Sequence, residues 1–140
     1  MTKYDDIKNK LKMIPHPEGG HYKESYKNNY VSLIYYLLKK GEKSHWHRLK
    51  KNEILHFYDG DPLRIFMSND EITTSEIILS KKISDNYLMH YTIKVGTWFS
   101  METKGEYSLI GCTVAPPFDY KDLELAPKNW KPGKYKPKIR

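Results

Sequence analysis

"GEKSHWHRLKKNEILHFYDGDPL", residues 41–63, places two histidines one residue apart and follows them with a basic turn and a glutamate. In a β-strand, residues i and i+2 point to the same face, so His45 and His47 would share one face. If the chain returns antiparallel after the turn, Glu53 comes level with the pair. On an interior face this triad has the chemistry of a metal site with open coordination positions. An H-x-H pair also occurs by chance in polar strands, so an ordinary surface strand is the alternative.

The alternation of faces continues beyond Glu53. Leu55 and Phe57 share its face, whereas His56 and Tyr58 fall on the opposite one. His56 is therefore not expected to be a fourth ligand unless a bulge resets the alternation. Its two open roles are a hydrogen-bonded histidine of the sheet and a catalytic histidine.

The rest of the chain has the same β character. Short segments rich in Tyr, Ile, Val, Leu, Phe and Thr alternate with polar turn clusters, and the expected strands are residues 20–27, 31–39, 44–49, 53–58, 63–68, 75–79, 87–95, 97–102 and 107–114. Such a series favours an all-β sandwich or jelly-roll barrel over an open sheet with helical crossovers. Ahead of the strands, Tyr4, Ile7 and Leu11 have helical spacing. They predict a short amphipathic N-terminal helix that ends at Pro15 and Pro17.

The net charge of +7 first suggests an anionic partner such as nucleic acid. Residues 128–140, however, hold six basic residues and no acid, so the other 18 basic residues nearly balance the 17 acidic ones. A Pro-spaced lysine segment is typical of a solvated chain end, and nucleic acid is therefore not the expected partner. We expect one domain over residues 1–126, followed by a basic Pro/Lys-rich tail over residues 127–140.

Cysteine usage and hydropathy predict the compartment. The single cysteine, Cys112, cannot form an internal disulfide, and the N-terminal residues carry acids where a secretory signal has an apolar core. The longest apolar run, residues 31–38, has eight residues, whereas crossing a bilayer takes about 20. We therefore expect a cytoplasmic protein without a membrane span, and a chain of this size needs no structural metal to fold.

The spacing of Gly41, His45, His47, Glu53 and Gly60 resembles the first conserved motif of the cupin superfamily, with a small change in its early part. Further phrases are similar to one subfamily, the single-domain "cupin five" proteins: HPEGGHYKESY (16–26), SHWHR (44–48), HFYDGDPL (56–63) and GCTVAPPFDYKDLELA (111–126). The resemblance covers residues 11–126. It implies a cupin jelly-roll (double-stranded β-helix) barrel that holds a small-molecule ligand, in a subfamily whose members largely lack an assigned reaction.

The second cupin motif, P-x-G-x-x-H, supplies the last metal ligand in the superfamily and reads KVGTWF here, at residues 94–99. Lys94 replaces the proline and Phe99 replaces the histidine. Phenylalanine can neither ligate a metal nor hydrogen-bond a polar ligand. Two possibilities follow for the triad defined above. It forms either a three-ligand site for a divalent transition metal (Fe, Mn, Ni or Zn), or a metal-free pocket in which the same residues bind substrate and move protons.

Other side chains are candidate ligand contacts because they lie near the triad or near the barrel mouth that the resemblance implies. These are Tyr22, Glu24, His56, Tyr58, Trp98 and Phe99. For Tyr22 and Glu24 the alternative is ordinary packing beside the Gly19-Gly20 bend.

Three functions fit these features. The first is an isomerase or epimerase-like enzyme for a small polar or carbohydrate-like molecule. In it, His45 or His47 takes a proton next to a carbonyl, and Glu53 or a tyrosine returns one. The second is a non-catalytic ligand-binding or sensing cupin, and the third is a two-His-one-carboxylate metal-dependent dioxygenase. The exposed N-terminal strand and the surplus of aromatic residues predict a homodimer.

Overall fold

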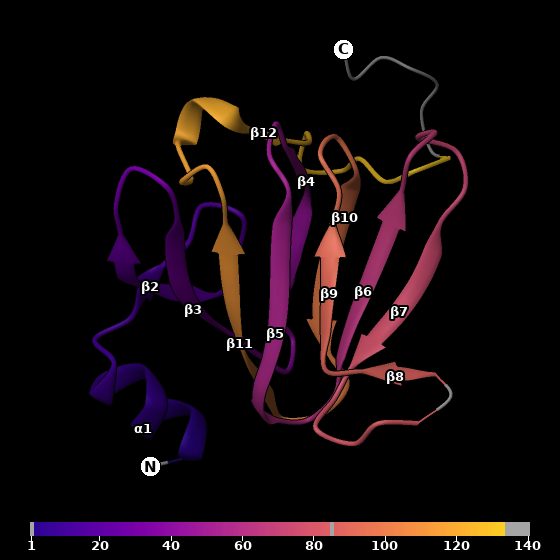
Figure 1. The fold of residues 1–140 in the computed structure, drawn as a ribbon. Helices are drawn as coiled ribbons and strands as arrows, with labels where there is room; N and C mark the ends of the chain where they lie inside the picture. The colour runs from indigo at the N-terminus through magenta and orange to yellow at the C-terminus, as the bar shows by residue number, and fades with distance from the viewer. Residues whose placement is uncertain (1, 85, 134–140) are drawn as a thin grey trace.

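The computed structural model describes residues 2–84 and 86–133, which form two six-stranded β-sheets facing each other (Figure 1). The first sheet has the order β1-β2-β3-β11-β5-β9 and the second the order β12-β4-β10-β6-β7-β8. All neighbouring strands are antiparallel except β7 and β8. The prediction of an all-β jelly-roll architecture with a short N-terminal helix is confirmed.

The elements follow the predicted segments closely. The first sheet contains β1 (Ile14–Pro15), β2 (His21–Lys27), β3 (Ser32–Lys39), β5 (Glu53–Gly60), β9 (His90–Ile93) and β11 (Tyr107–Val114). The second contains β4 (Ser44–Leu49), β6 (Leu63–Ser68), β7 (Ser75–Leu79), β8 (Tyr87–Leu88), β10 (Trp98–Thr103) and β12 (Leu123–Leu125), the last preceded by a 3-10 turn, Tyr120–Asp122. The segment expected as one strand over residues 87–95 is divided into β8 and β9, and β1 and β12 are additional short strands.

The main hydrophobic core lies between the two sheets because the strands alternate apolar and polar side chains. In β5, Leu55 and Phe57 are buried in this core while Tyr58 is exposed. The other core residues come from both sheets: Tyr36, Leu38, Leu63, Ile65, Met67, Leu79, Ile93, Phe99, Met101, Ile110 and Cys112.

Helix α1 (Lys3–Lys10) covers part of the outer face of the first sheet. Thr2 and Asp5 form a reciprocal capping box that satisfies the free N–H groups at its start. Tyr4 packs with Leu37 and Leu109 in a second hydrophobic cluster. The helix ends at Lys10, before Pro15 and Pro17, which were expected to stop it. Within the described part of the chain, no helix has the length and apolarity needed to span a membrane.

The start of the expected C-terminal tail packs on the protein. Trp130 is only 2% exposed and its ring lies against Trp98, with ring centroids 4.9 Å apart. Ala126 joins the same cluster. The chain up to this tryptophan is therefore attached to the second sheet, while residues 134–140 of the expected basic tail lie outside the described residues.

Candidate functional site

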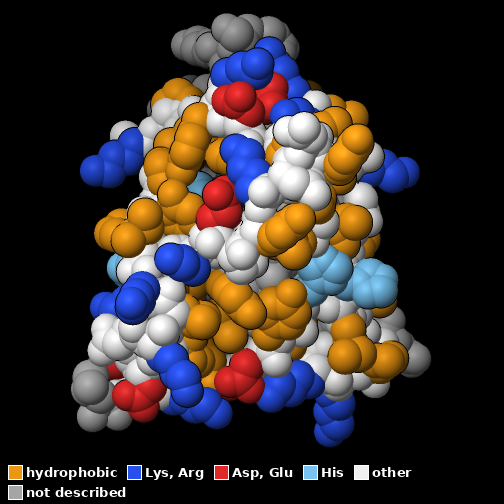
Figure 2. Space-filling model, turned by 60° about the vertical axis from the view of Figure 1, so that its left-hand side comes forward, with side chains coloured by type: hydrophobic (Ala, Val, Ile, Leu, Met, Phe, Trp, Pro, Cys, Tyr) orange, Lys and Arg blue, Asp and Glu red, His pale blue; other side chains and the backbone are white. Residues whose placement is uncertain are grey.

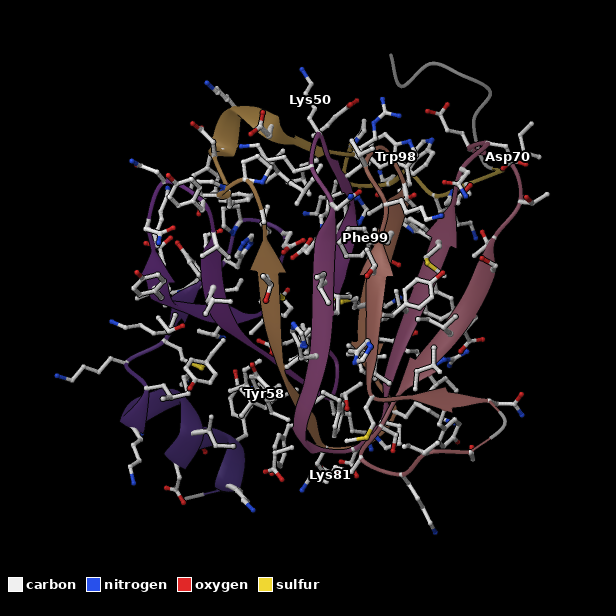
Figure 3. The ribbon with its side chains drawn as sticks, in the orientation of Figure 1. Lys50, Tyr58, Asp70, Lys81, Trp98 and Phe99 are labelled. Carbon is white, nitrogen blue, oxygen red and sulfur yellow. The ribbon has the colours of Figure 1, made fainter. Side chains whose placement is uncertain are left out.

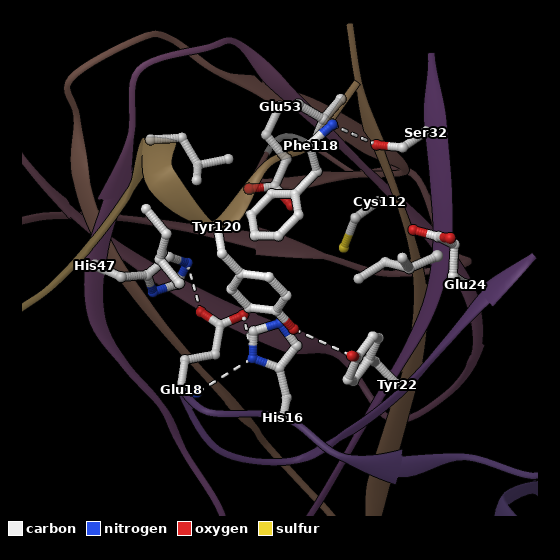
Figure 4. A pocket seen from close by; sticks show the side chains of 14 residues that line it. His16, Glu18, Tyr22, Glu24, Ser32, His47, Glu53, Cys112, Phe118 and Tyr120 are labelled. Atoms are coloured by element: carbon white, nitrogen blue, oxygen red, sulfur yellow. Dashed lines mark hydrogen bonds and ion pairs between the residues drawn. The ribbon is translucent and has the colours of Figure 1, made fainter. Parts of the chain in front are cut away.

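A cavity of about 70 Å³ opens between the two sheets (Figure 4). Residues from the β1–β2 loop, from strands of both sheets and from the segment after β11 line it: His16, Glu18, Tyr22, Glu24, Ser32, Ile34, His47, Leu49, Glu53, Cys112, Val114, Phe118, Tyr120 and Leu123. A water molecule needs roughly 10–15 Å³ of such space. The cavity therefore holds several waters or one compact ligand.

A buried carboxylate–imidazole pair forms the floor of this cavity. The Nε2 atom of His47 lies 2.6 Å from the Oε2 atom of Glu18, and the Ser44 hydroxyl donates a 2.9 Å hydrogen bond to the same oxygen. The side chains of Glu18 and His47 are 9% and 3% exposed. The second ring nitrogen of His47, Nδ1, donates a 2.6 Å hydrogen bond to the His45 carbonyl. Because both ring nitrogens act as donors, the imidazole is held in its protonated, charged form.

The electrostatics of the pair agree with this geometry. Burial disfavours the charged imidazole, but the charge and hydrogen bond of Glu18 outweigh it and raise the pKa of His47. Burial also disfavours the Glu18 carboxylate, and His47 nevertheless lowers the pKa of that carboxyl. His16 accepts a hydrogen bond from the Glu18 N–H at its Nδ1 atom, and burial lowers the pKa of this histidine. The floor thus holds one ion pair and one neutral imidazole.

Glu18 is brought inside by a tight loop between β1 and β2. Gly19 and Gly20 have φ values of +116° and +76°, which residues other than glycine rarely adopt. A Cβ atom on Gly19 would lie 1.9 Å from the Lys43 carbonyl oxygen, so the loop backbone packs directly against the residues before β4. The Glu18 carbonyl also accepts a 2.7 Å hydrogen bond from the His45 N–H. These backbone contacts aim the Glu18 carboxylate at His47.

His45 and His47 do not share a face, contrary to the prediction from the strand alternation. In the pairing of β4 with β10, His47 lies opposite Phe99 but Ser44 lies opposite Met101, so β4 has one extra residue there. This β-bulge turns both Ser44 and His47 inward. The ring of His45 lies outside the cavity and donates a 2.9 Å hydrogen bond to the Pro127 carbonyl.

Glu53 reaches the cavity from the opposite sheet. It begins β5 in the first sheet, whereas β4 belongs to the second and pairs with β10 and β12, so Glu53 is not a strand neighbour of His47. Burial and the negative charge of Glu18 raise the pKa of Glu53 to about 7, against the smaller opposing effects of His47 and a hydrogen bond with Cys112. The pKa of this carboxyl therefore lies much closer to neutral pH than that of an ordinary glutamate.

The predicted contacts Tyr22 and Glu24 both line the cavity. The hydroxyl of Tyr22 lies 3.1 Å from the hydroxyl of Tyr120, and this tyrosine pair connects β2 with the segment after β11 (Figure 4). Burial and the hydrogen bond to Tyr22 raise the pKa of Tyr120 to about 12. Two phenol side chains therefore face the cavity.

Trp98 and Phe99, labelled on β10 in Figure 3, are not among the residues that line the cavity. Phe99 packs against the imidazole of His47, with ring centroids 4.1 Å apart. This contact helps to fix the position of the imidazole that pairs with Glu18. Trp98 points to the other side of β10, where its indole N–H donates a 3.1 Å hydrogen bond to Glu71.

His56 and Tyr58 lie on the outer face of the first sheet, as the alternation from Glu53 predicts. The Nε2 atom of His56 is 3.1 Å from the Thr113 hydroxyl, and its ring neighbours that of His90 on β9. Tyr58 packs on Tyr35. Histidine side chains gather beside apolar ones on the surface in Figure 2. Both residues are therefore separated from the cavity by the sheet.

The residues of the predicted triad do not fit a metal ion in this arrangement. His45 is turned away, and both ring nitrogens of His47 already donate hydrogen bonds within the protein. Phe99 occupies the position of the fourth ligand in the second motif. Among residues 2–84 and 86–133, no three His, Cys, Asp or Glu side chains are grouped so that they could hold a metal. The structure gives the dioxygenase hypothesis no ligand set.

Sequence reasoning missed Glu18 and His16 as members of the site. Their signal was the phrase HPEGG, in which a glutamate stands between a proline and two glycines. Such a loop is structured by its backbone, so a charged side chain within it has a fixed direction. The direction itself depends on the contact with β4.

An all-β jelly roll with a cavity between its sheets defines the class of this protein. The family described as "Cupin superfamily (DUF985)" matches residues 5–126, and the chain belongs to this family. No curated protein matches the sequence.

Solved structures show the same fold. A protein from Shewanella oneidensis is 32% identical with a TM-score of 0.85, over 90% of this chain and 85% of that one. A hypothetical protein from Leishmania major is 26% identical with a TM-score of 0.78, over 87% of this chain and 86% of that one. Oxalate decarboxylase from Bacillus subtilis is 12% identical with a TM-score of 0.65, over 79% of this chain and 29% of that one, and shares only the fold.

Proposed function

We propose that the cavity is an active site for proton transfer, of the isomerase or epimerase type, on a small polar or carbohydrate-like molecule. The observation that carries this proposal is the placement of Glu53, whose pKa is raised to about 7, in the same cavity as the Glu18–His47 ion pair. A group with a pKa near the working pH is the most effective general acid or base. Glu53 would take a proton from a carbon next to a carbonyl and return it to the same or the neighbouring carbon.

The other residues of the cavity would support this transfer. The charged imidazole of His47 offsets negative charge as it develops on the substrate oxygen. One hydroxyl of the Tyr22–Tyr120 pair donates to the other, so the pair has one O–H left to donate to a substrate group and oxygen lone pairs to accept from substrate hydroxyls. His45 has no role in this scheme because its ring lies outside the cavity.

Deuterium exchange tests the proposal. The protein is incubated in D₂O with dihydroxyacetone, glyceraldehyde and erythrulose, and loss of the carbon-bound proton signal is followed by NMR. We expect protein-dependent exchange with at least one of these, reduced about 100-fold or more by Glu53→Gln and unchanged by His45→Gln. Exchange that survives Glu53→Gln would remove Glu53 from the mechanism.

A non-catalytic binding or sensing protein is the second candidate, favoured by the commitment of both ring nitrogens of His47 to the protein itself. In that case ligands bind without any exchange of their protons. Binding by the wild-type protein together with no exchange for any of the three probes would favour this candidate.

The homodimer and the cytoplasmic location stay predictions. Tyr26 in β2 and Tyr30 in the turn between β2 and β3 are 53% and 80% exposed. Exposed aromatic residues of this kind are enriched at protein interfaces, which supports the dimer.

A further inference from the structure

The charge of the cavity is opposite to that of the whole protein. The chain has 24 Lys and Arg residues, and basic side chains are scattered over the surface in Figure 2. None of the described residues that line the cavity is a lysine or an arginine, whereas three of them, Glu18, Glu24 and Glu53, are glutamates. Among the described residues that line this cavity, the acidic side chains therefore outnumber the basic ones.

The buried charges of the cavity are also incompletely balanced. Glu18 is paired with His47, and His16 accepts a hydrogen bond at Nδ1 as a neutral imidazole does. The side-chain hydrogen bond that lowers the pKa of Glu53 is the one with the thiol of Cys112. Two carboxyls thus share one imidazolium, and the negative charge of Glu18 opposes ionisation of Glu53.

The nearby basic side chain that could supply the missing charge is held elsewhere. Lys51 follows β4, but its Nζ atom donates a 2.7 Å hydrogen bond to the Pro117 carbonyl and forms a 2.6 Å ion pair with Asp122. Lys51 does not line the cavity. Since no lysine or arginine among the described residues lines the cavity, an ammonium group of a ligand would complement the Glu53 carboxylate.

We propose that the ligand of this cavity is a small hydroxylated amine, bound with its ammonium group between Glu53 and Glu18, and that small anions are rejected. Glu24, exposed at the mouth, would attract the cation. The hydroxyls of Tyr22 and Tyr120 would contact the ligand hydroxyls. This inference rests on the proposed function only in that both use the same cavity, and it names a class of ligand for that cavity.

The ammonium also changes the ionisation of the site. Since it favours the charged form of Glu53, binding lowers the pKa of this carboxyl from about 7 and releases protons near neutral pH. Affinity for the amine should therefore rise between pH 6 and pH 8, while affinity for an uncharged alcohol should not. The other charged groups facing Glu53 are Glu18 and His47, and their ion pair raises the pKa of His47 and lowers that of Glu18.

Three probes of nearly equal size test the proposal: ethanolamine, ethylene glycol and glycolate, which are positive, neutral and negative at pH 7.5. Their binding to the whole protein is measured by NMR titration of its amide signals. We expect ethanolamine to bind at least about tenfold more tightly than ethylene glycol, as for a hydrogen bond to a charged group, and glycolate to bind most weakly. Equal binding of ethanolamine and glycolate, or no binding of ethanolamine, would overturn the proposal.

Variants locate the effect. Glu53→Gln, close in shape and uncharged, should abolish the preference for ethanolamine over ethylene glycol, and Glu106→Gln, at an exposed glutamate away from the cavity, should retain it. Glu24→Gln should lower the preference by a smaller factor and provides a second test if Glu53→Gln does not fold. Deuterium exchange distinguishes the two proposals: exchange of a neutral keto sugar without an amine preference contradicts only the amine, and an amine preference without exchange contradicts only the catalysis.

Discussion

The two faces of β4 carry the same residue type in different surroundings. On the inner face, His47 is 3% exposed, donates two hydrogen bonds and pairs with a buried carboxylate. On the outer face, His45 contacts one carbonyl group, and its neighbour Trp46 packs on Trp130 with ring centroids 6.0 Å apart. The difference shows that the burial and the hydrogen-bonding partners of each histidine in an H-x-H pair determine its chemical role. One extra residue in the strand decides which of the two histidines is buried.

Removing the inner histidine should have the largest effect on stability. His47→Ala leaves the Glu18 carboxylate buried without its partner, which typically costs about 3–5 kcal/mol. We expect a decrease of this size in the free energy of unfolding, measured with urea at pH 7. His45→Ala is the matched control and should cost less than about 1 kcal/mol, because it loses one accessible hydrogen bond. Similar losses for the two variants would contradict the assignment of the two faces.

The pH dependence of stability should depend on Glu53. Its pKa is raised from 4.5 to about 7 by burial and by Glu18, so folding disfavours the ionised form and stability decreases as the pH rises from about 4.5 through 7. A shift of this size corresponds to a loss on the order of 3 kcal/mol. The raised pKa of His47 acts in the same direction, because its contribution is lost as the pH rises through that pKa.

Urea unfolding at pH 5 and pH 8 measures this dependence. We expect the wild-type protein to be less stable at pH 8, and Glu53→Gln to show a clearly smaller difference between the two pH values. An equal difference in the variant would show that Glu53 is not the titrating group.

The smallest effect concerns the loop that positions Glu18. In Gly19→Ala the alanine would have a strained φ of +116°, and its Cβ atom would clash with the Lys43 carbonyl oxygen at 1.9 Å. The loop must therefore move. Gly41→Ala has a φ of +90° but no atom within 4 Å of the new Cβ, so it has only the conformational cost of about 1–2 kcal/mol. We expect Gly19→Ala to destabilise by at least about 1 kcal/mol more than Gly41→Ala in the same urea assay. It should also weaken ligand binding, whereas Gly41→Ala should not.

Much of the fold follows from local patterns. The alternation of Leu55 and Phe57 with His56 and Tyr58 correctly separates the inner from the outer side chains of β5. The spacing of Tyr4, Ile7 and Leu11 correctly predicts α1 and its packing face. These features depend on the two-residue repeat of a strand and the 3.6-residue repeat of a helix, which are properties of the chain itself.

The candidate site was predictable only in part. The motif spacing predicts His47 and Glu53, the family resemblance predicts Tyr22 and Glu24, and all four line the cavity. The inward turn of Glu18 was not, because it depends on the backbone contact between Gly19 and Lys43. A residue's distance along the chain contains no information about such a contact.

The sequence by itself determined the strands, the helix, the family and the approximate position of the site. Only the tertiary structure decided that His45 lies outside, that Glu18 replaces it beside His47, and that Glu53 faces this pair from the other sheet. The physical reason is that a bulge is set by the pairing of β4 with β10, and the partner of a buried charge is set by which loops and sheets meet around it.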